Sequence, residues 1–150
     1  MMTLVKYDEL FLAKSYEWLN DPEIRDLTDG PVCLTHEMQQ KWYAQILSDP
    51  TYAIWGIDWD GVKIGACGIK HIDLSNNVGE YWGYIGEKQY WNGKGHTLMN
   101  LVYQKARELK LNKLYLVVLV NNLRAFRLYQ SEGFVIDKRD DDRIYMSKEL

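Results

Sequence analysis

Residues 90–97 of this chain are YWNGKGHT, and they stand between a strand pattern and a helix pattern. Gly93 and Gly95 lack the side chains that would block a close approach of the backbone. Exposed amides and the positive end of a helix can hold an anion at such a turn, and Lys94 would add positive charge at its rim. The segment therefore favours a diphosphate site, although similar letters also occur in ordinary strand-to-helix turns.

The glycine spacing excludes two other phosphate-binding motifs. A P-loop needs glycine where Lys88 stands, and Ser or Thr where Gly95 stands. The dinucleotide fingerprint needs a different glycine spacing and an acidic residue about twenty positions later. We therefore expect neither a Walker-type nor a Rossmann-type nucleotide site.

Three alternating stretches come before this segment. Residues 52–59, 62–74 and 78–85 alternate apolar and polar side chains, which is the pattern of strands. Asp60-Gly61 and residues 75–77 supply the tight turns between them. Because short turns join antiparallel neighbours, we expect an antiparallel meander.

The flanking stretches add helices and further strands. In chain order, the elements expected outside the meander are a strand over 3–7, a helix over 9–19, a short helix from Pro22 to Leu27, a loop over 28–34, a helix that follows Thr35 and ends near Asp49, a helix from Thr97 to Leu109, a buried strand over 111–120, a helix over 123–131 stopped by Gly133, and a hairpin of 134–137 and 144–146 around the charged residues 138–143. We predict an α+β fold in which residues 1–150 form one domain. Its mixed sheet has about six to seven strands, an antiparallel meander followed by strand-helix-strand, and is flanked by about four helices.

The composition is that of a globular protein. Hydrophobic residues make up 47% and charged residues 26% of the 150 residues, which argues against disorder. The net charge of −3 gives no general attraction to nucleic acid or to anionic membranes. The first dozen residues carry charges and no long apolar run, so we expect neither a signal peptide nor a membrane span.

The cysteines and histidines indicate no disulfide framework and no metal site. Cys33 and Cys67 are the two cysteines, and they form no CxxC pair. His36, His71 and His96 show no metal-ligand spacing. Cys33 and His36 lie three residues apart without an orienting acid, which disfavours a nucleophilic cysteine. We expect a cytoplasmic protein without a metal.

A second motif follows the expected buried strand, where residues 122–134 are NLRAFRLYQSEGF. Together with residues 91–97, this segment resembles the GCN5-related N-acetyltransferase (GNAT) superfamily, which has a glycine-rich pyrophosphate loop and then the pattern N-x-x-A-x-x-x-Y-x-x-x-G-F. Residues 18–25, WLNDPEIR, and residues 80–85, EYWGYI, are similar to the branch of the ribosomal-protein N-terminal acetyltransferases. That branch includes small enzymes, of the pseudaminic acid biosynthesis type, that acetylate amino groups on nucleotide-linked sugars. The short length of this chain is similar to theirs.

The resemblance implies a cofactor and the residues that bind it. Acetyl-CoA would be the acetyl donor. The cofactor-binding positions that the resemblance implies are Ile85, Asn92, Gly93, Lys94, Gly95, His96, Thr97 and Asn122. Asn92 and Thr97 depart from the polar and small residues usual in the loop, which binding through main-chain amides tolerates. Asn122 could equally cap the helix that follows it, and the two roles are compatible.

Acetyl transfer to an amine needs a base and an acid. A primary aliphatic amine is mostly protonated near neutral pH, so a proton must leave before the nitrogen attacks a thioester. Glu80 matches an acidic position of the related branch and is the expected base, directly or through a water, with His71 as the alternative. A backbone N–H at or near Ile85 would stabilise the oxyanion. Tyr129 matches the general acid of the superfamily, unless it only packs under its helix.

We expect the acceptor to be a small-molecule amine. We favour a nucleotide-linked amino sugar over a protein N-terminus or another small amine, and we expect a monomer or homodimer. Trp55, Tyr81, Trp82 and Tyr84 would line the acceptor pocket, with half of them turned into the core by strand alternation. A noncatalytic acyl-CoA-binding module with the same fold is the alternative from another class.

Overall fold

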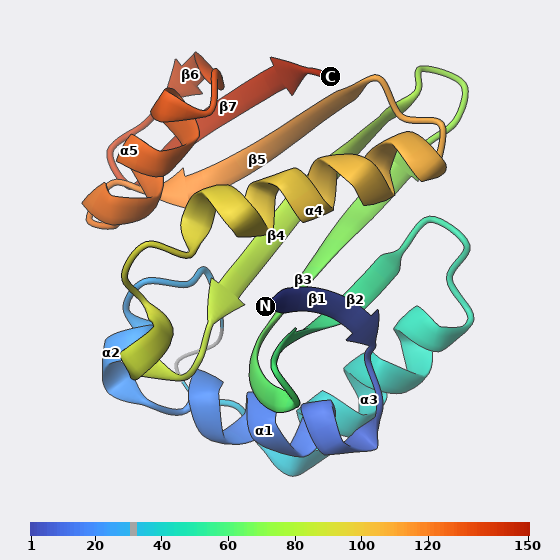
Figure 1. Ribbon diagram of the computed structural model, residues 1–150, viewed down its shortest axis with the longest axis vertical. Coiled ribbons are helices and arrows are strands. Elements are labelled where there is room, and N and C mark those ends of the chain that lie inside the picture. Colours follow the sequence, from blue (N-terminus) through green and yellow to red (C-terminus); the bar gives the residue numbers. More distant parts are fainter. Residues whose placement is uncertain (31–32) are drawn as a thin grey trace.

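The computed structural model describes residues 1–30 and 33–150 (Figure 1). The elements, in chain order, are β1 (Met2–Lys6), α1 (Glu9–Leu19), α2 (Pro22–Arg25), α3 (His36–Leu47), β2 (Ala53–Trp59), β3 (Val62–Asp73), β4 (Val78–Ile85), the 3-10 helix η1 (Lys88–Tyr90), α4 (Gly95–Glu108), β5 (Lys113–Leu119), α5 (Leu123–Ser131), β6 (Val135–Arg139) and β7 (Arg143–Glu149). Residues 31 and 32, within the loop expected over 28–34, lie outside the described residues.

The strands form one mixed sheet in the order β1-β2-β3-β4-β5-β7-β6. β2, β3 and β4 make the predicted antiparallel meander. β4 then pairs in parallel with β5, and α4 connects the two strands. The predicted α+β fold, with a meander followed by a strand-helix-strand unit, is confirmed.

β4 and β5 are paired only where they begin. Three residue pairs, from Val78–Lys113 to Glu80–Tyr115, join the two strands, and these described strands show no further pair. β4 remains paired with β3 as far as Ile85. The two parallel strands therefore diverge towards their carboxyl ends (Figure 1), which is where open sheets bind their ligands.

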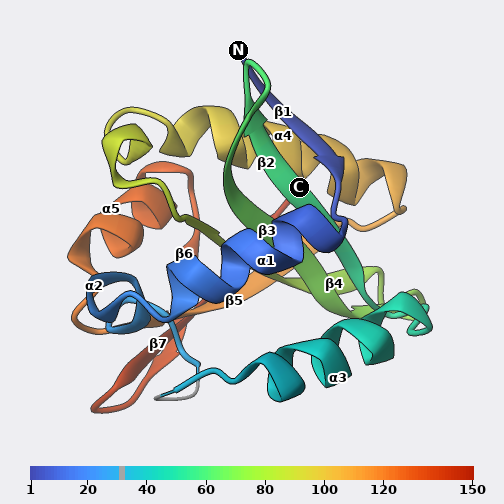
Figure 2. The ribbon, with the colours of Figure 1, turned by 90° about the horizontal axis from the view of Figure 1, so that it is seen from below.

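Helices cover both faces of the sheet (Figure 2). α4 lies against one face, where Met99 and Val102 pack with strand residues such as Cys67. α1, α2 and α3 lie against the other face, where Phe11 packs near Ala66. Ala66 and Cys67 are neighbours on β3 and point to opposite faces, so the two hydrophobic clusters are separated by the sheet.

Side-chain caps begin the first three helices. Asp8, Asp21 and Thr35 each accept a hydrogen bond from a backbone amide in the first turn of α1, α2 and α3. These bonds satisfy amides that have no partner within the helix. Pro22 fits the first turn of α2 because proline has no backbone N–H that would need a hydrogen-bond partner there.

Several boundaries differ from the predictions, and the sequence does not predict η1. α2 ends at Arg25, and the chain continues towards Leu27 in turns. α4 begins at Gly95, two residues before Thr97, because glycine's poor helix propensity conceals a helix start. β6 and β7 extend into the charged residues 138–143, because β6 is a sheet edge whose five residues are all exposed and can carry charge.

Candidate active site

Two cavities meet where β4 and β5 diverge. One, of about 820 Å³, lies between the start of α4 and α5 and is called the α4–α5 cleft. The other, of about 510 Å³, is lined in part by residues of α1 and α3 and is called the aromatic pocket. The residues that line both are Leu27, Thr28, Tyr81, Gly83, Tyr84, Asn122, Ala125 and Tyr129. A molecule in the cleft can therefore meet a molecule in the pocket across this shared wall.

The glycine-rich turn forms one end of the α4–α5 cleft. Asn92, Gly93, Gly95 and His96 line it, as predicted positions. Gly93 has a φ of +75°, which L-residues with side chains adopt only with strain. A Cβ on Gly95 would lie 2.6 Å from the side chain of Leu128 on α5, so this glycine lets α4 and α5 approach closely. No side chain caps the start of α4, which leaves its first amides for an anion.

Two predicted cofactor positions do not line the cleft with their side chains. The Lys94 ammonium lies over the ring of Trp59, 4.6 Å from its centroid, and it is not among the described residues of either cavity. Thr97 is exposed and also lies outside both linings. The positive charge expected from Lys94 at the rim is therefore directed elsewhere.

Ile85 and Asn122 do line the α4–α5 cleft. The carbonyl oxygen of Ile85 accepts a hydrogen bond of 2.7 Å from the indole of Trp91, which ties the turn to the end of β4. The side-chain oxygen Oδ1 of Asn122 accepts a hydrogen bond from the backbone amide of Ala125, so the expected capping role of Asn122 in α5 is confirmed. Its amide nitrogen also donates to the backbone oxygen of Leu27 at 3.2 Å.

Two basic residues of the cleft were missed by the sequence analysis. Arg124 and Arg127 line it from α5. Their i, i+3 spacing places them on one face of the helix, which was the available signal, but charged helical residues usually face solvent. The Arg124 guanidinium also lies 5.2 Å from the ring centroid of Trp91. The cleft therefore carries two positive charges suited to phosphate groups.

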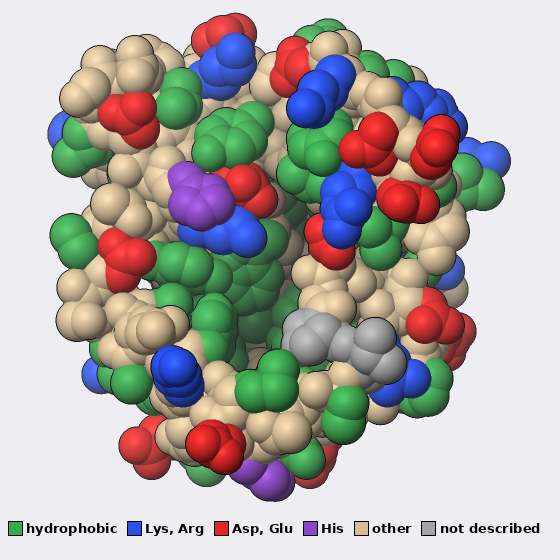
Figure 3. Space-filling model, turned by 180° about the vertical axis from the view of Figure 1, so that it is seen from behind, with side chains coloured by type: hydrophobic (Ala, Val, Ile, Leu, Met, Phe, Trp, Pro, Cys, Tyr) green, Lys and Arg blue, Asp and Glu red, His purple; other side chains and the backbone are tan. Residues whose placement is uncertain are grey.

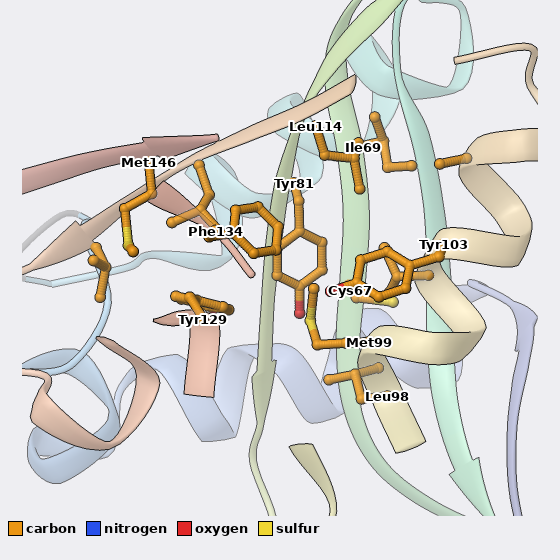
Figure 4. Packing of buried hydrophobic residues seen from close by; sticks show 14 of the residues in the cluster. Cys67, Ile69, Tyr81, Leu98, Met99, Tyr103, Leu114, Tyr129, Phe134 and Met146 are labelled. Carbon is orange, nitrogen blue, oxygen red and sulfur yellow. The ribbon is translucent and has the colours of Figure 1, made fainter. Parts of the chain in front are cut away.

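Tyr129 lies on the shared wall of the two cavities. Its side chain comes from α5 and is 9% exposed, with Tyr81 and Phe134 beside it (Figure 4). Burial raises the pKa of Tyr129 to about 12, and the neighbouring hydroxyl of Tyr81 opposes part of this rise. The ring therefore belongs to the core, while its protonated hydroxyl remains able to donate a proton or a hydrogen bond.

The walls of the aromatic pocket are a chain of rings. Trp42 and Tyr52 are 6.4 Å apart between centroids, Tyr52 and Trp82 are also 6.4 Å apart, and Trp82 stacks on Tyr84 at 6.2 Å. The face opposite α4 is hollowed and lined by hydrophobic side chains, with charged and histidine side chains gathered at one edge of the hollow (Figure 3). Of the four predicted aromatic residues, Trp55 is absent from the described lining.

The two predicted bases lie beside each other. Glu80 lines the aromatic pocket, and its side chain is 16% exposed. Nδ1 of His71 is 3.2 Å from Oε1 of Glu80, and Nζ of Lys70 is 3.7 Å from Oε2. His71 is 64% exposed and is not among the described residues that line either cavity. Only Glu80 of the pair therefore faces the pocket.

Neither cysteine is among the described residues that line the two cavities. Cys67 is buried, and burial raises the pKa of its thiol. Cys33 is exposed, while His36 stacks on Tyr16 at 3.7 Å. Residues 1–30 and 33–150 contain no group of three or more His, Cys, Asp or Glu side chains placed to hold a metal. In the same residues, no helix has the length and apolar character needed to cross a bilayer.

Solved acetyltransferases share this fold. The spermidine N-acetyltransferase from Vibrio cholerae, solved with CoA and spermine, has a TM-score of 0.89 at 21% identity, covering 99% of this chain and 95% of its own. The N-acetyltransferase PseH from Campylobacter jejuni, solved with acetyl coenzyme A, has a TM-score of 0.77 at 22% identity, covering 100% and 99%. The aminoglycoside acetyltransferase AAC(6')-Ib, solved with coenzyme A, has a TM-score of 0.82 at 19% identity, covering 99% and 95%.

Sequence comparison adds the family. No curated protein matches the chain significantly. A protein-family model described as "Acetyltransferase (GNAT) family" matches residues 12–134, which is most of the chain. The match includes both the glycine-rich turn and the segment with Tyr129 that line the α4–α5 cleft. The chain therefore belongs to the acetyltransferase (GNAT) family and is an acetyl-CoA-dependent N-acetyltransferase.

Proposed function

We propose that this protein acetylates the primary amine of an amino sugar carried by a nucleotide, with acetyl-CoA bound in the α4–α5 cleft and the sugar in the aromatic pocket. The observation that carries the proposal is the shared wall at Tyr129, which lines both cavities. It allows a thioester from one side to meet an amine from the other.

The cofactor would be held mainly by main-chain groups and arginines. Asn92, Gly93, Gly95 and His96 line the cleft where the diphosphate would lie, and the start of α4 supplies amides. In this proposal Lys94 and Thr97 contribute only their main-chain groups. The two cleft arginines of α5 would bind phosphates as well, because a guanidinium offers several donors to an oxyanion.

The chemical steps follow from the groups around the shared wall. Glu80, directly or through a water, removes a proton from the substrate ammonium, and the free amine attacks the thioester carbonyl. A backbone N–H at or near Ile85 donates to the oxyanion. The raised pKa of the Tyr129 hydroxyl keeps it protonated at neutral pH, so Tyr129 can give its proton to the departing thiolate. The second proton that leaves the attacking nitrogen then returns to the Tyr129 oxygen and restores the phenol. The acetyl group passes directly to the amine, without an acyl-enzyme.

The aromatic pocket supports an amino sugar as acceptor. Sugar rings present C–H faces that pack on Trp and Tyr, and the rings of Trp42, Tyr52, Trp82 and Tyr84 offer such faces around about 510 Å³. The negatively charged nucleotide would stay at the pocket mouth, because the carboxylate of Glu80 lines the pocket and is only 16% exposed. The likeness to an aminoglycoside acetyltransferase fits a sugar-borne amine.

A linear polyamine is the second candidate acceptor. Asp29 and Glu80 both line the aromatic pocket, so two carboxylates could receive two positive charges of one chain. The likeness to the Vibrio cholerae spermidine N-acetyltransferase agrees with this possibility. A protein N-terminus is supported less well, because the pocket walls are mostly apolar rings.

We further propose that the protein works in the cytoplasm. Cys33 and Cys67 are both free thiols, as a reducing compartment maintains them.

The test is a thiol-release assay with a matched set of amines. The set contains nucleotide-linked amino sugars, the same amino sugars without nucleotide, polyamines and peptides with free N-termini. The proposal predicts the highest kcat/KM for the nucleotide-linked sugars, a lower value for the free sugars because the nucleotide contributes binding, and little turnover of the peptides. Higher kcat/KM for spermidine than for every sugar would replace the first candidate by the second. CoA binding with no turnover of any amine in the set would contradict every acceptor class proposed here.

A further inference from the structure

We propose that His71 is the exit through which the proton taken up by Glu80 leaves the active site. This inference rests on the proposed function, in which Glu80 is the base. Conversion of an ammonium and a thioester into an amide and a thiol releases one proton per turnover. A base inside a pocket must therefore pass that proton on before it can act again.

The Glu80–His71 pair reaches from the pocket to solvent. Oε1 of Glu80 and Nδ1 of His71 are 3.2 Å apart, which is hydrogen-bonding distance. The Glu80 side chain is 16% exposed and lines the aromatic pocket, whereas the His71 side chain is 64% exposed and lies outside it. The carboxylate thus faces the substrate, and the imidazole that contacts it faces water.

The backbone at His71 is arranged to make this contact. In a regular strand, Lys70 and His71 would point to opposite faces of the sheet. Instead, the β3–β4 pairing shifts register between Lys70 and Asp73, and His71 has a φ of +53°. A residue with a side chain seldom adopts this left-handed region, and such conformations gather at functional sites. As a result, both basic side chains reach the same carboxylate of Glu80.

The other charged and titratable groups around the pair cannot replace the imidazole. Lys70 contacts Glu80, but a lysine ammonium is already protonated at neutral pH, whereas a histidine both accepts and releases protons there. Tyr52, directly before β2, and Tyr115 on β5 have pKa values that burial raises above the usual range, and the Glu80 charge raises them further. Asp49 lies near His71, and hydrogen bonds from Thr51 hold the pKa of the Asp49 carboxyl below its usual value.

One proton per turnover passes along the Glu80–His71 pair. Glu80 takes one proton from the substrate ammonium and becomes a neutral carboxylic acid. That proton passes from the carboxyl oxygen to Nδ1 of the neutral His71 ring, which regenerates the carboxylate and forms an imidazolium. The imidazolium then loses a proton to water or buffer, so that both side chains return to their starting charge.

Two variants of His71 separate proton transfer from positioning. His71→Gly suits the positive φ and leaves room for imidazole, while His71→Gln keeps a hydrogen-bond donor for Glu80 and cannot transfer a proton. The proposal predicts that kcat falls roughly tenfold or more in both variants, that the KM for the amine changes much less, and that added imidazole restores the kcat of His71→Gly. His36→Gln, which changes a histidine stacked on Tyr16, is the matched control and should retain the wild-type kcat.

The other outcomes of these experiments would contradict the relay. A wild-type kcat in His71→Gln would show that His71 only positions Glu80, and it would overturn the relay. A low kcat in His71→Gly that imidazole does not raise would overturn it as well. Full activity of Glu80→Gln would remove the base, and with it the relay, while acetyl transfer itself would stand. Failure of the wild-type protein to acetylate any amine would instead overturn the proposed function.

Discussion

At the scale of single residues, the hydroxyl of Tyr129 decides whether the shared wall is catalytic. Tyr129→Phe removes this hydroxyl and keeps the ring that packs on Tyr81 and Phe134. We expect kcat to fall roughly 100-fold or more, because a positioned general acid contributes about 10²–10⁴-fold, while the Kd for CoA changes little. Steady-state thiol release and calorimetric CoA binding measure the two quantities.

Tyr145→Phe is the control, because Tyr145 lies on β7 and is not among the described residues that line either cavity. An equal loss of kcat and CoA affinity in Tyr129→Phe would show that Tyr129 has only a structural role.

Gly93 and Gly61 provide a matched pair for the glycine-rich turn. Both have positive φ, +75° and +88°, and a Cβ would meet no atom within 4 Å at either position. Alanine at each should therefore cost about 1–2 kcal/mol of unfolding free energy through backbone strain alone. Only Gly93→Ala should also weaken CoA binding, because Gly61 lies in the β2–β3 hairpin. Urea unfolding and calorimetry test this, and unchanged CoA affinity in Gly93→Ala would exclude the turn from the site.

The sequence predicts single residues best where the backbone itself sets their role. Gly93, Gly95 and Asn122 lie in the cleft because a turn, a close helix contact and a helix cap each require a particular residue type. The direction of a long side chain does not follow from such a rule. Lys94 turns to the ring of Trp59, and Arg124 lines the cleft, because tertiary neighbours decide between solvent, ring and cavity.

At the scale of elements, the meander and the strand-helix-strand unit could be predicted because alternation and tight turns are local signals. The final hairpin was predicted too short, because β6 has no buried face and its charged residues follow no alternation. The divergence of β4 and β5 could not be predicted, since it depends on where two distant strands stop pairing.

One wall of the aromatic pocket is held by a cross-element clamp. Nε and Nη2 of Arg143 on β7 donate to the two carboxylate oxygens of Asp29 at 2.8 and 2.9 Å, and Asp29 lines the pocket. We expect Arg143→Gln to raise the KM for the acceptor about two- to fivefold, the range of a partly exposed ion pair, with little change in kcat or CoA affinity. Arg139→Gln on β6 is the control. The exchange Asp29→Arg with Arg143→Asp should restore part of the loss, and a failure to do so would mean that the clamp does not shape the pocket.

At the scale of the whole molecule, buried tyrosines set the alkaline limit of stability. Burial raises the pKa values of Tyr7 and Tyr129 to about 12, above the value near 10 of an unfolded chain. Between these two values the native protein binds more protons than the unfolded chain. The contribution of the buried tyrosines to the unfolding free energy is therefore fully present below pH 10 and is lost as the pH rises towards 12. Each tyrosine should remove about 2–3 kcal/mol by the time the pH passes 12.

The measurement compares two signals during one alkaline titration. Absorbance of tyrosinate from the buried rings should appear together with the loss of helical circular dichroism, whereas the chain in concentrated urea should titrate without such a transition. Full ionisation of the tyrosines with native circular dichroism would show that water reaches the core rings.

The short pairing of β4 with β5 divides the sheet into two panels, β1–β4 and β5–β7, that share a seam of three residue pairs. We expect this short seam to act as a hinge, and CoA bound between the two strands to hold the panels together. Amide hydrogen exchange along the outer halves of β4 and β5 should then slow when CoA binds. The two panels would move relative to each other in the free enzyme and be held together once acetyl-CoA is bound, so that the donor prepares the pocket for the acceptor.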